Sequence, residues 1–144
     1  MNNNFKIPTN NLALALSGGA ARGAFHLGVL DFCEQNNIEI KAYSGSSIGA
    51  VISASHASGV SAKEQLKIFS SADVKKALKF NYFKNGLLKI DTNSKIIKEL
   101  LPIEKLEDIP KPIWINAYDT KRKELHYFNK GDTITLCMAS SALI

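Results

Sequence analysis

The chain has 144 residues, of which 45% are hydrophobic and 22% are charged, a composition typical of one soluble globular domain. Its 18 basic and 13 acidic residues give a net charge of +5. No helix carries a stripe of arginines and no aromatic residues alternate with the basic ones, so we expect no nucleic-acid partner. The excess of positive charge predicts a mild attraction to anionic membrane surfaces or anionic substrates.

The cysteines and the apolar runs bear on location and cofactors. Cys33 and Cys137 each lie among apolar residues, which predicts buried thiols rather than a disulfide or a metal pair. No stretch resembles a signal peptide or approaches the length of a membrane span. We therefore expect a cytoplasmic protein, peripheral to a membrane at most. We expect no metal and no cofactor, because no His, Asp and Glu residues cluster with ligand spacing.

The first 60 residues contain two similar units. Residues 12–16 form a short apolar run that ends at a glycine-rich turn, and residues 24–35 have apolar positions near helical spacing. Residues 38–43 then alternate between apolar and polar, and the small apolar residues from 48 toward Gly59 follow a second sharp turn. Two consecutive strand–turn–helix units predict a parallel sheet with right-handed crossovers.

The middle of the chain is predicted to be helical. Ser61 and Glu64 have the spacing of a capping box, and helical periodicity continues from there to about Leu78. A second amphipathic helix is predicted over residues 92–101, where Pro102 ends it. The segment 61–101 is a candidate cover for an acyl chain, through the apolar residues Leu66, Ile68, Phe69, Phe80, Tyr82, Phe83, Leu87 and Leu88.

The last third is predicted to contain a hairpin and a helix. Residues 113–118 form a strand, residues 119–122 a polar turn, and residues 124–128 the returning strand. Asp132 is placed to cap a final helix over residues 133–142.

A nucleophile motif follows the second predicted strand. Residues 45–49 read Gly-Ser-Ser-Ile-Gly, a G-x-S-x-G pattern. A nucleophile elbow requires a serine in a strained strand-to-helix turn, with glycines two residues to either side so that the chain can double back. The pattern alone is weak, but its predicted strand and helix supply the required context. We therefore predict that Ser47 is a nucleophile, held by Gly45, Ile48 and Gly49.

A glycine-rich loop follows the first predicted strand. Residues 18–23 read Gly-Gly-Ala-Ala-Arg-Gly, and backbone N–H groups on such a loop can hold an oxyanion or a phosphate. A dinucleotide loop fits poorly, because Ala20 stands where its second glycine is needed. A P-loop is excluded because no lysine is followed by Ser or Thr. We predict that Gly18, Gly19 and Ala20 donate to an oxyanion at the carboxyl edge of the sheet, beside Ser47.

The two motifs together resemble the patatin-like phospholipase family. Its first block is Gly-Gly-Gly-x-Arg/Lys-Gly, which Arg22 and Gly23 match here and in which Ala20 replaces the third glycine. An alanine keeps the N–H group, but we expect it to lack the freedom to adopt a positive φ. The second block matches in full, with Ser47 placed 29 residues after Gly18 as in the family. Residues 114–132 and 138–142 resemble later parts of the family more loosely.

The resemblance implies a fold and a reaction. The fold is α/β with three layers, a mainly parallel central sheet with helices on both faces. Residues 1–144 would be the N-terminal part of a single patatin-like domain that is truncated at its C-terminus. The implied activity is hydrolysis of a lipid acyl ester by a Ser-Asp dyad, with Ser47 as nucleophile, residues 18–23 as oxyanion loop and Arg22 ordering that loop.

The general base is the missing part of this assignment. The family's aspartate precedes glycine, and this sequence contains no Asp-Gly dipeptide. Asp119 falls in the predicted hairpin turn, and His26, His56 and His126 are not placed as in a Ser-His-Asp hydrolase. The alternative is therefore a truncated, inactive patatin-like module that binds lipid or a partner protein. A nucleotide-binding α/β domain is a third hypothesis, and it predicts indifference to Ser47→Ala.

Overall fold

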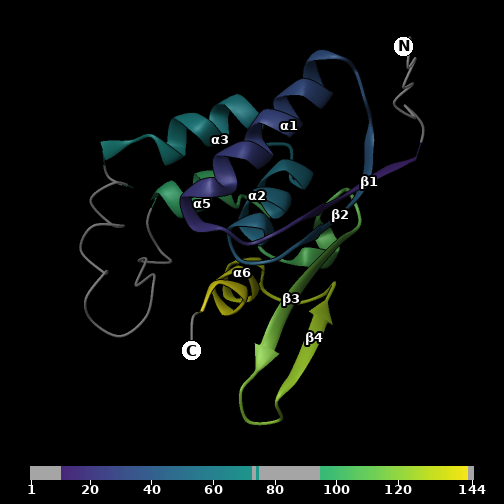
Figure 1. Ribbon diagram of the computed structural model, residues 1–144, viewed down its shortest axis with the longest axis vertical. Helices are drawn as coiled ribbons and strands as arrows, with labels where there is room; N and C mark the ends of the chain where they lie inside the picture. The colour runs from purple at the N-terminus through teal and green to yellow at the C-terminus, as the bar shows by residue number, and fades with distance from the viewer. Residues whose placement is uncertain (1–10, 73, 75–94, 143–144) are drawn as a thin grey trace, which may run out of the picture.

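The computed structural model describes residues 11–72, 74 and 95–142, which form a four-stranded sheet with helices packed against it (Figure 1). The strands are β1 (Leu12–Leu16), β2 (Ile40–Gly45), β3 (Ile113–Asp119) and β4 (Glu124–Phe128), in that order across the sheet. The first three strands are parallel and β4 is antiparallel to β3. The predicted α/β class with a mainly parallel sheet is confirmed.

The helical elements follow the predicted order. Those described are η1 (Ala20–Gly23), α1 (Ala24–Gln35), α2 (Ile48–Ala57), α3 (Ala62–Phe69), α5 (Lys95–Leu100), η2 (Leu106–Asp108) and α6 (Thr133–Ser141).

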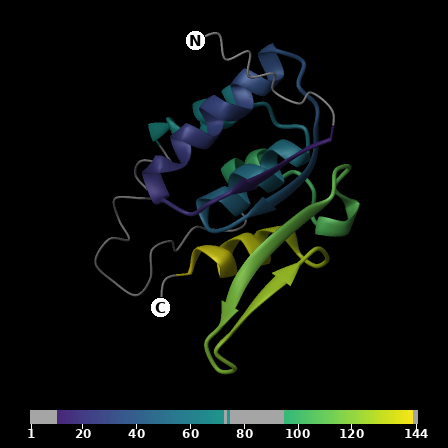
Figure 2. The ribbon, with the colours of Figure 1, turned by 45° about the vertical axis from the view of Figure 1, so that its right-hand side comes forward.

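The described helices lie on one face of the sheet (Figure 2). Because the strands follow one another in sequence order, right-handed crossovers place every connecting helix on the same side. Helix α2 packs against β1, β2 and β3, and α6 packs against β3 and α2. These helices account for one of the two predicted helical layers, and the second has no counterpart among the described residues. The opposite face carries the exposed Ala13, Ala15 and Trp114.

The core lies between the sheet and these helices. Alternate residues of the strands point into it, as Leu16, Tyr43 and Ile115 do. Both cysteines are buried there as free thiols, as predicted. Burial raises the pKa of Cys33 and raises that of Cys137 to about 12, so both remain protonated and unreactive at neutral pH.

The predicted helix caps are present, but one helix is shorter than expected. The Ser61 hydroxyl accepts a hydrogen bond from the Glu64 N–H at 3.3 Å, and the Glu64 carboxylate accepts from the Ser61 N–H at 2.9 Å. Helix α3 ends at Phe69, and a break follows at Ser70 and Ser71. Ala72 and Val74 are helical again, and the rest of the predicted stretch, residues 73 and 75–78, lies outside the described residues.

A buried hydrogen-bond chain ties the sheet to three helices. His56 accepts a bond from the Tyr43 hydroxyl at Nδ1 (2.6 Å) and donates from Nε2 to the Glu34 carboxylate (2.9 Å). The same Glu34 oxygen accepts the Ala62 N–H at 2.8 Å. Burial lowers the pKa of His56; the Glu34 carboxylate acts against this, while Lys111 adds to it. The chain therefore requires a neutral imidazole.

This chain makes stability depend on pH. Since the pKa of His56 is lower in the folded protein than its ordinary value of about 6.5, the unfolded protein takes up the proton first. The free energy of unfolding should fall as pH drops from 7 to 5, by at most about 1.4 kcal/mol per pH unit. Urea denaturation at each pH measures the free energy of unfolding. In His56→Gln this free energy should depend less on pH than in the wild type.

The matched control is His126→Gln, which removes a histidine from the hairpin and should keep the wild-type pH dependence. Equal pH profiles for wild type and His56→Gln would contradict this account.

Candidate active site

Ser47 occupies a strained turn between β2 and α2. Its φ of 52° and ψ of −125° lie in a region that residues with side chains rarely adopt, at a cost of about 1–3 kcal/mol. The turn reverses the chain directly from the last strand residue into the first turn of α2. Ser47 is the N-cap of that helix, half-buried, with its side chain at the positive end of the helix dipole.

The two motif glycines permit this turn through close backbone contacts. A Cβ atom on Gly49 would lie 2.1 Å from the Leu16 carbonyl oxygen, and one on Gly45 would lie 2.5 Å from the Ala50 Cα. Both contacts are with backbone atoms, which cannot move aside. The G-x-S-x-G spacing therefore reflects the direct packing of α2 onto the ends of β1 and β2.

Substitution of these glycines should unfold the protein. Gly49→Ala should lower the free energy of unfolding by about 3 kcal/mol or more, because the new methyl group overlaps the β1 backbone. Gly28→Ala is the matched control: nothing lies within 4 Å of its added methyl in α1, so it should raise stability by about 0.5–1 kcal/mol. Urea denaturation followed by circular dichroism compares them, and equal stabilities would refute the packing argument.

The glycine-rich loop lies directly beside the serine. A Cβ on Gly18 would lie 3.2 Å from the Ser47 Cβ and 3.9 Å from its Oγ, although the two residues are far apart in sequence. The Ser46 N–H donates to the Leu16 carbonyl at 3.0 Å, which ties the turn to the end of β1. His26 Nε2 donates to the Ser17 carbonyl at 2.9 Å and fixes the start of the loop. The structure thus brings the two sequence motifs together.

Several backbone donors near Ser47 are unpaired. Within residues 11–72, 74 and 95–142, the N–H groups of Gly18, Gly19, Ala20 and Ile48 donate no hydrogen bond. The next groups along α2 are paired, since the Gly49 N–H reaches the Ser46 carbonyl at 2.8 Å. Unpaired N–H groups on a loop and at a helix N-terminus are suited to binding an anion.

The expectation for Ala20 is wrong. Ala20 has a φ of 48°, so it adopts the left-handed conformation that we expected only glycine to take there. The cost is about 1–2 kcal/mol. Surrounding contacts hold the loop: the Arg22 N–H donates to the Gly19 carbonyl at 3.0 Å, and Gly23 leaves room for Ile48, whose Cγ1 would lie 2.7 Å from a Cβ there. The Arg22 side chain is exposed, and its predicted role in ordering the loop stays a prediction.

Sequence reasoning missed two residues that hold the turn from outside. The Ser47 N–H donates to the Ser140 hydroxyl of α6 at 2.8 Å. The Ser140 hydroxyl in turn donates to Asn116 Oδ1 of β3 at 3.4 Å. The sequence predicted the helix and the strand, but nothing in it indicated that these polar side chains lie beside Ser47. Ser140 contacts the backbone of Ser47 and not its hydroxyl.

Removal of this acceptor should loosen the turn. Ser140→Ala leaves a half-buried N–H unpaired and should cost about 1–3 kcal/mol of unfolding free energy, measured by urea denaturation. Ser141→Ala is the control, because the Ser141 hydroxyl only bonds the Cys137 carbonyl of its own helix. A fluorophosphonate probe should also label Ser47 more slowly in Ser140→Ala than in Ser141→Ala. Equal labelling rates would show that Ser140 does not position the nucleophile.

No described residue is placed as a general base. In the part of the chain that the structure describes, no side chain hydrogen-bonds the Ser47 hydroxyl. The Asp119 carboxylate accepts from the N–H groups of Arg122 and Lys121, which lower its pKa and commit it to the hairpin turn. His26 and His56 bond other partners, and His126 Nε2 lies 3.5 Å from Glu124. Each of these residues contacts other partners, and none hydrogen-bonds the Ser47 hydroxyl in the described structure.

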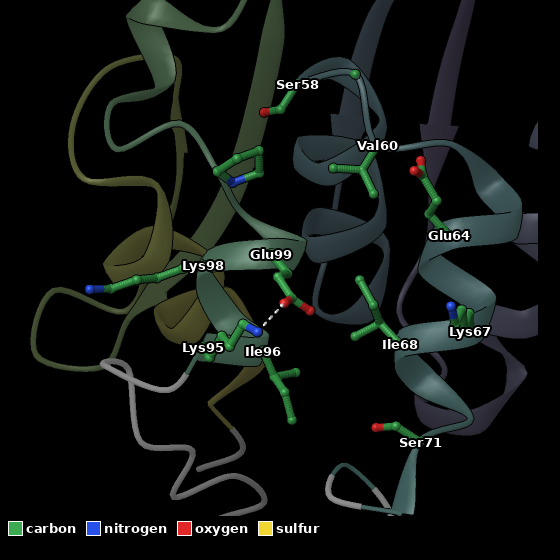
Figure 3. A pocket seen from close by; sticks show the side chains of 12 residues that line it. Ser58, Val60, Glu64, Lys67, Ile68, Ser71, Lys95, Ile96, Lys98 and Glu99 are labelled. Atoms are coloured by element: carbon green, nitrogen blue, oxygen red, sulfur yellow. Dashed lines mark ion pairs between the residues drawn. The ribbon is translucent and has the colours of Figure 1, made fainter.

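A surface hollow lies away from Ser47. It has a volume of about 770 Å³ and lies between α3 and α5, near Ser58 at the opposite end of α2 (Figure 3). Ile68 lines it together with charged residues such as Lys67 and Glu99. Of the predicted acyl-chain cover, Leu66 is exposed and Phe69 is half-buried, while Phe80, Tyr82, Phe83, Leu87 and Leu88 lie outside the described residues. The hollow is therefore not part of the candidate site around Ser47.

Comparison with known proteins identifies the family. The sequence model of the family described as patatin-like phospholipase matches residues 14–144. The chain belongs to this family. Uncharacterized NTE family proteins of Mycobacterium bovis and Mycobacterium tuberculosis are 26% identical over 134 residues, which is 92% of this chain and 37% of theirs. Human patatin-like phospholipase domain-containing protein 6 is 44% identical over 48 residues, 33% of this chain and 4% of that protein.

Solved structures agree on the fold. The crystal structure of the type III effector protein ExoU matches with a TM-score of 0.64 at 18% identity, over 91% of this chain and 39% of that one. The chain therefore spans little more than a third of the length of the bacterial relatives it matches. Across the described ranges, every helix is too short or too polar to span a bilayer. In those same ranges, no three His, Cys, Asp or Glu side chains form a group that could hold a metal ion.

Proposed function

We propose that this patatin-like domain contributes the nucleophile and the oxyanion hole of a lipid acyl hydrolase that works through a Ser-Asp dyad. The observation that carries the proposal is the position of Gly18 against Ser47, which places a loop with unpaired N–H groups beside a serine in a strained turn. Family membership supports a lipid ester as substrate. The strain supports a catalytic role, since such backbone conformations cluster at active sites.

The reaction begins with attack of Ser47 Oγ on the acyl carbonyl carbon. The hydroxyl proton passes to the aspartate, and the carbonyl oxygen takes up the electron pair as an oxyanion. Collapse of this intermediate breaks the ester bond, and the leaving alkoxide takes the proton from the aspartate. The same aspartate then deprotonates a water molecule, which attacks the acyl-enzyme carbonyl carbon. The bond to Ser47 Oγ breaks, Oγ takes the proton from the aspartate, and the fatty acid is released.

The oxyanion would be held by backbone N–H groups. Gly18 and Gly19 would donate from the loop beside Ser47, and Ile48 would donate from the first turn of α2. Because these groups are unpaired in the described chain, they have no hydrogen bond to break before they bind the charge. One such donor is worth about 2.7–4 kcal/mol of barrier, or roughly 100- to 1,000-fold in kcat.

The aspartate that acts as general base is not among the described residues near Ser47. Since no described carboxylate approaches the Ser47 hydroxyl, we propose that it comes from a segment beyond residue 144. The alternative, an inactive module that binds lipid or a partner, is supported by the same observation. Labelling of Ser47 distinguishes the two.

The test is reaction of the full-length product of the gene with a fluorophosphonate serine probe. We expect labelling to map to Ser47 by mass spectrometry and to fall at least about 100-fold in Ser47→Ala. Ser58→Ala, at the other end of α2, is the control and should label as the wild type does.

Circular dichroism should first show that all three proteins are folded. A folded product that remains unlabelled, or that labels equally in Ser47→Ala, would refute the hydrolase and leave the inactive module.

A further inference from the structure

The β3–β4 hairpin projects from the sheet (Figure 1). It extends past the edge at which β2 ends and Ser47 follows. The last paired residue of β2, Gly45, lies opposite Ile115 of β3. Strand β3 continues to Asp119, so the hairpin extends about 13 Å beyond that point at roughly 3.3 Å per residue. Its turn is therefore the outermost described part of the chain on this side of the sheet.

One face of the hairpin is apolar and exposed. Tyr118, Leu125 and Tyr127, which we call the hairpin face, are 50%, 51% and 61% exposed. Tyr118 pairs with Leu125 across the strands. Tyr127 lies two residues after Leu125 in β4, so its side chain is on the same side of the hairpin. Tyrosines suit an interface between water and an apolar phase, because the ring is apolar and the hydroxyl is polar.

The tip of the hairpin is basic. Lys121, Arg122 and Lys123, which we call the basic turn, are all exposed. Two carboxylates flank them: Asp119 is engaged by the N–H groups of the turn, and Glu124 lies 3.5 Å from His126. Three cations on the outermost loop therefore outnumber the neighbouring carboxylates. Such a cluster is attracted to an anionic lipid surface by about 1 kcal/mol per residue.

Exposed apolar and basic residues also lie at the carboxyl end of β1, the strand next to β2 on the side away from the hairpin. Helix α1 begins at the carboxyl end of β1, and there Phe25 is 78% exposed next to the exposed Arg22. Exposed apolar and basic groups therefore lie on both sides of the turn that contains Ser47.

We propose that the hairpin face and the basic turn dock this domain on the surface of an anionic lipid bilayer, with the Ser47 edge toward the lipid. The choice of lipid rests on the proposed function. The apolar side chains enter the headgroup region while the three cations neutralise anionic headgroups. Docking at this edge brings an acyl ester toward Ser47 without moving the nucleophile.

The experiment measures sedimentation of the full-length gene product with phosphatidylglycerol vesicles and with phosphatidylcholine vesicles. We expect binding to the anionic vesicles. Most of it should be lost in 0.5 M salt, because the Debye length is then well below its value of about 8 Å at 0.15 M. The triple variant Lys121→Gln, Arg122→Gln, Lys123→Gln should bind about 100-fold more weakly. Tyr118→Ser with Leu125→Ser should also weaken binding, with the basic turn intact.

A matched triple variant controls for net charge. Lys63→Gln, Lys67→Gln and Lys98→Gln remove three exposed lysines from α3 and α5, on other surfaces, and should bind as the wild type does. Ser47→Ala should bind the vesicles as the wild type does. Vesicle binding therefore tests the docking proposal, while probe labelling in the absence of vesicles tests the proposed hydrolase. Equal weakening by both triple variants, or no binding to anionic vesicles by the folded wild type, would overturn the proposal.

Discussion

The direct contact between the backbone of α2 and the carboxyl ends of β1 and β2 is the constraint on which the site depends. Gly49 packs against the Leu16 carbonyl at a distance that leaves no room for a side chain, and Gly45 does the same against Ala50. With the helix this close, the connecting residue has to adopt a positive φ, and Ser47 takes that strain. The position of Ser47 is therefore a consequence of backbone packing.

The remaining contacts of the site follow from that approach. The turn is bonded to β1 through Ser46 and to α6 through Ser140, so groups from both sides fix the one strained residue. The loop after β1 is held within van der Waals distance of Ser47 because β1 is the neighbour of β2 in the sheet. The buried chain from Tyr43 to Glu34 fixes the other end of α2. Helix α2 thus has Ser47 at one end and the hydrogen-bonded His56 near the other.

Local patterns in the sequence predicted most of the fold. Local structures depend on residues near one another in the chain, so the sequence can predict them. These include the two strand–turn–helix units, the hairpin, and the helix caps at Ser61 and Asp132. The link between Ser47 and Ser140 joins positions 93 residues apart, and a lone serine in a helix gives no sign of its distant partner. The strain at Ala20 was missed for another reason. Tertiary contacts can impose a conformation that the residue itself disfavours.

The most direct measurement of the central claim is a crystal structure of the full-length gene product after reaction with a fluorophosphonate, which mimics the tetrahedral intermediate on Ser47. The account predicts that the phosphonyl oxygen lies about 2.7–3.1 Å from N–H groups of the Gly18–Gly19 loop and of Ile48, with the Ser140 bond to the Ser47 N–H intact. An adduct whose oxygen points to solvent, away from both sets of donors, would contradict the assignment of this loop and this turn as one catalytic site.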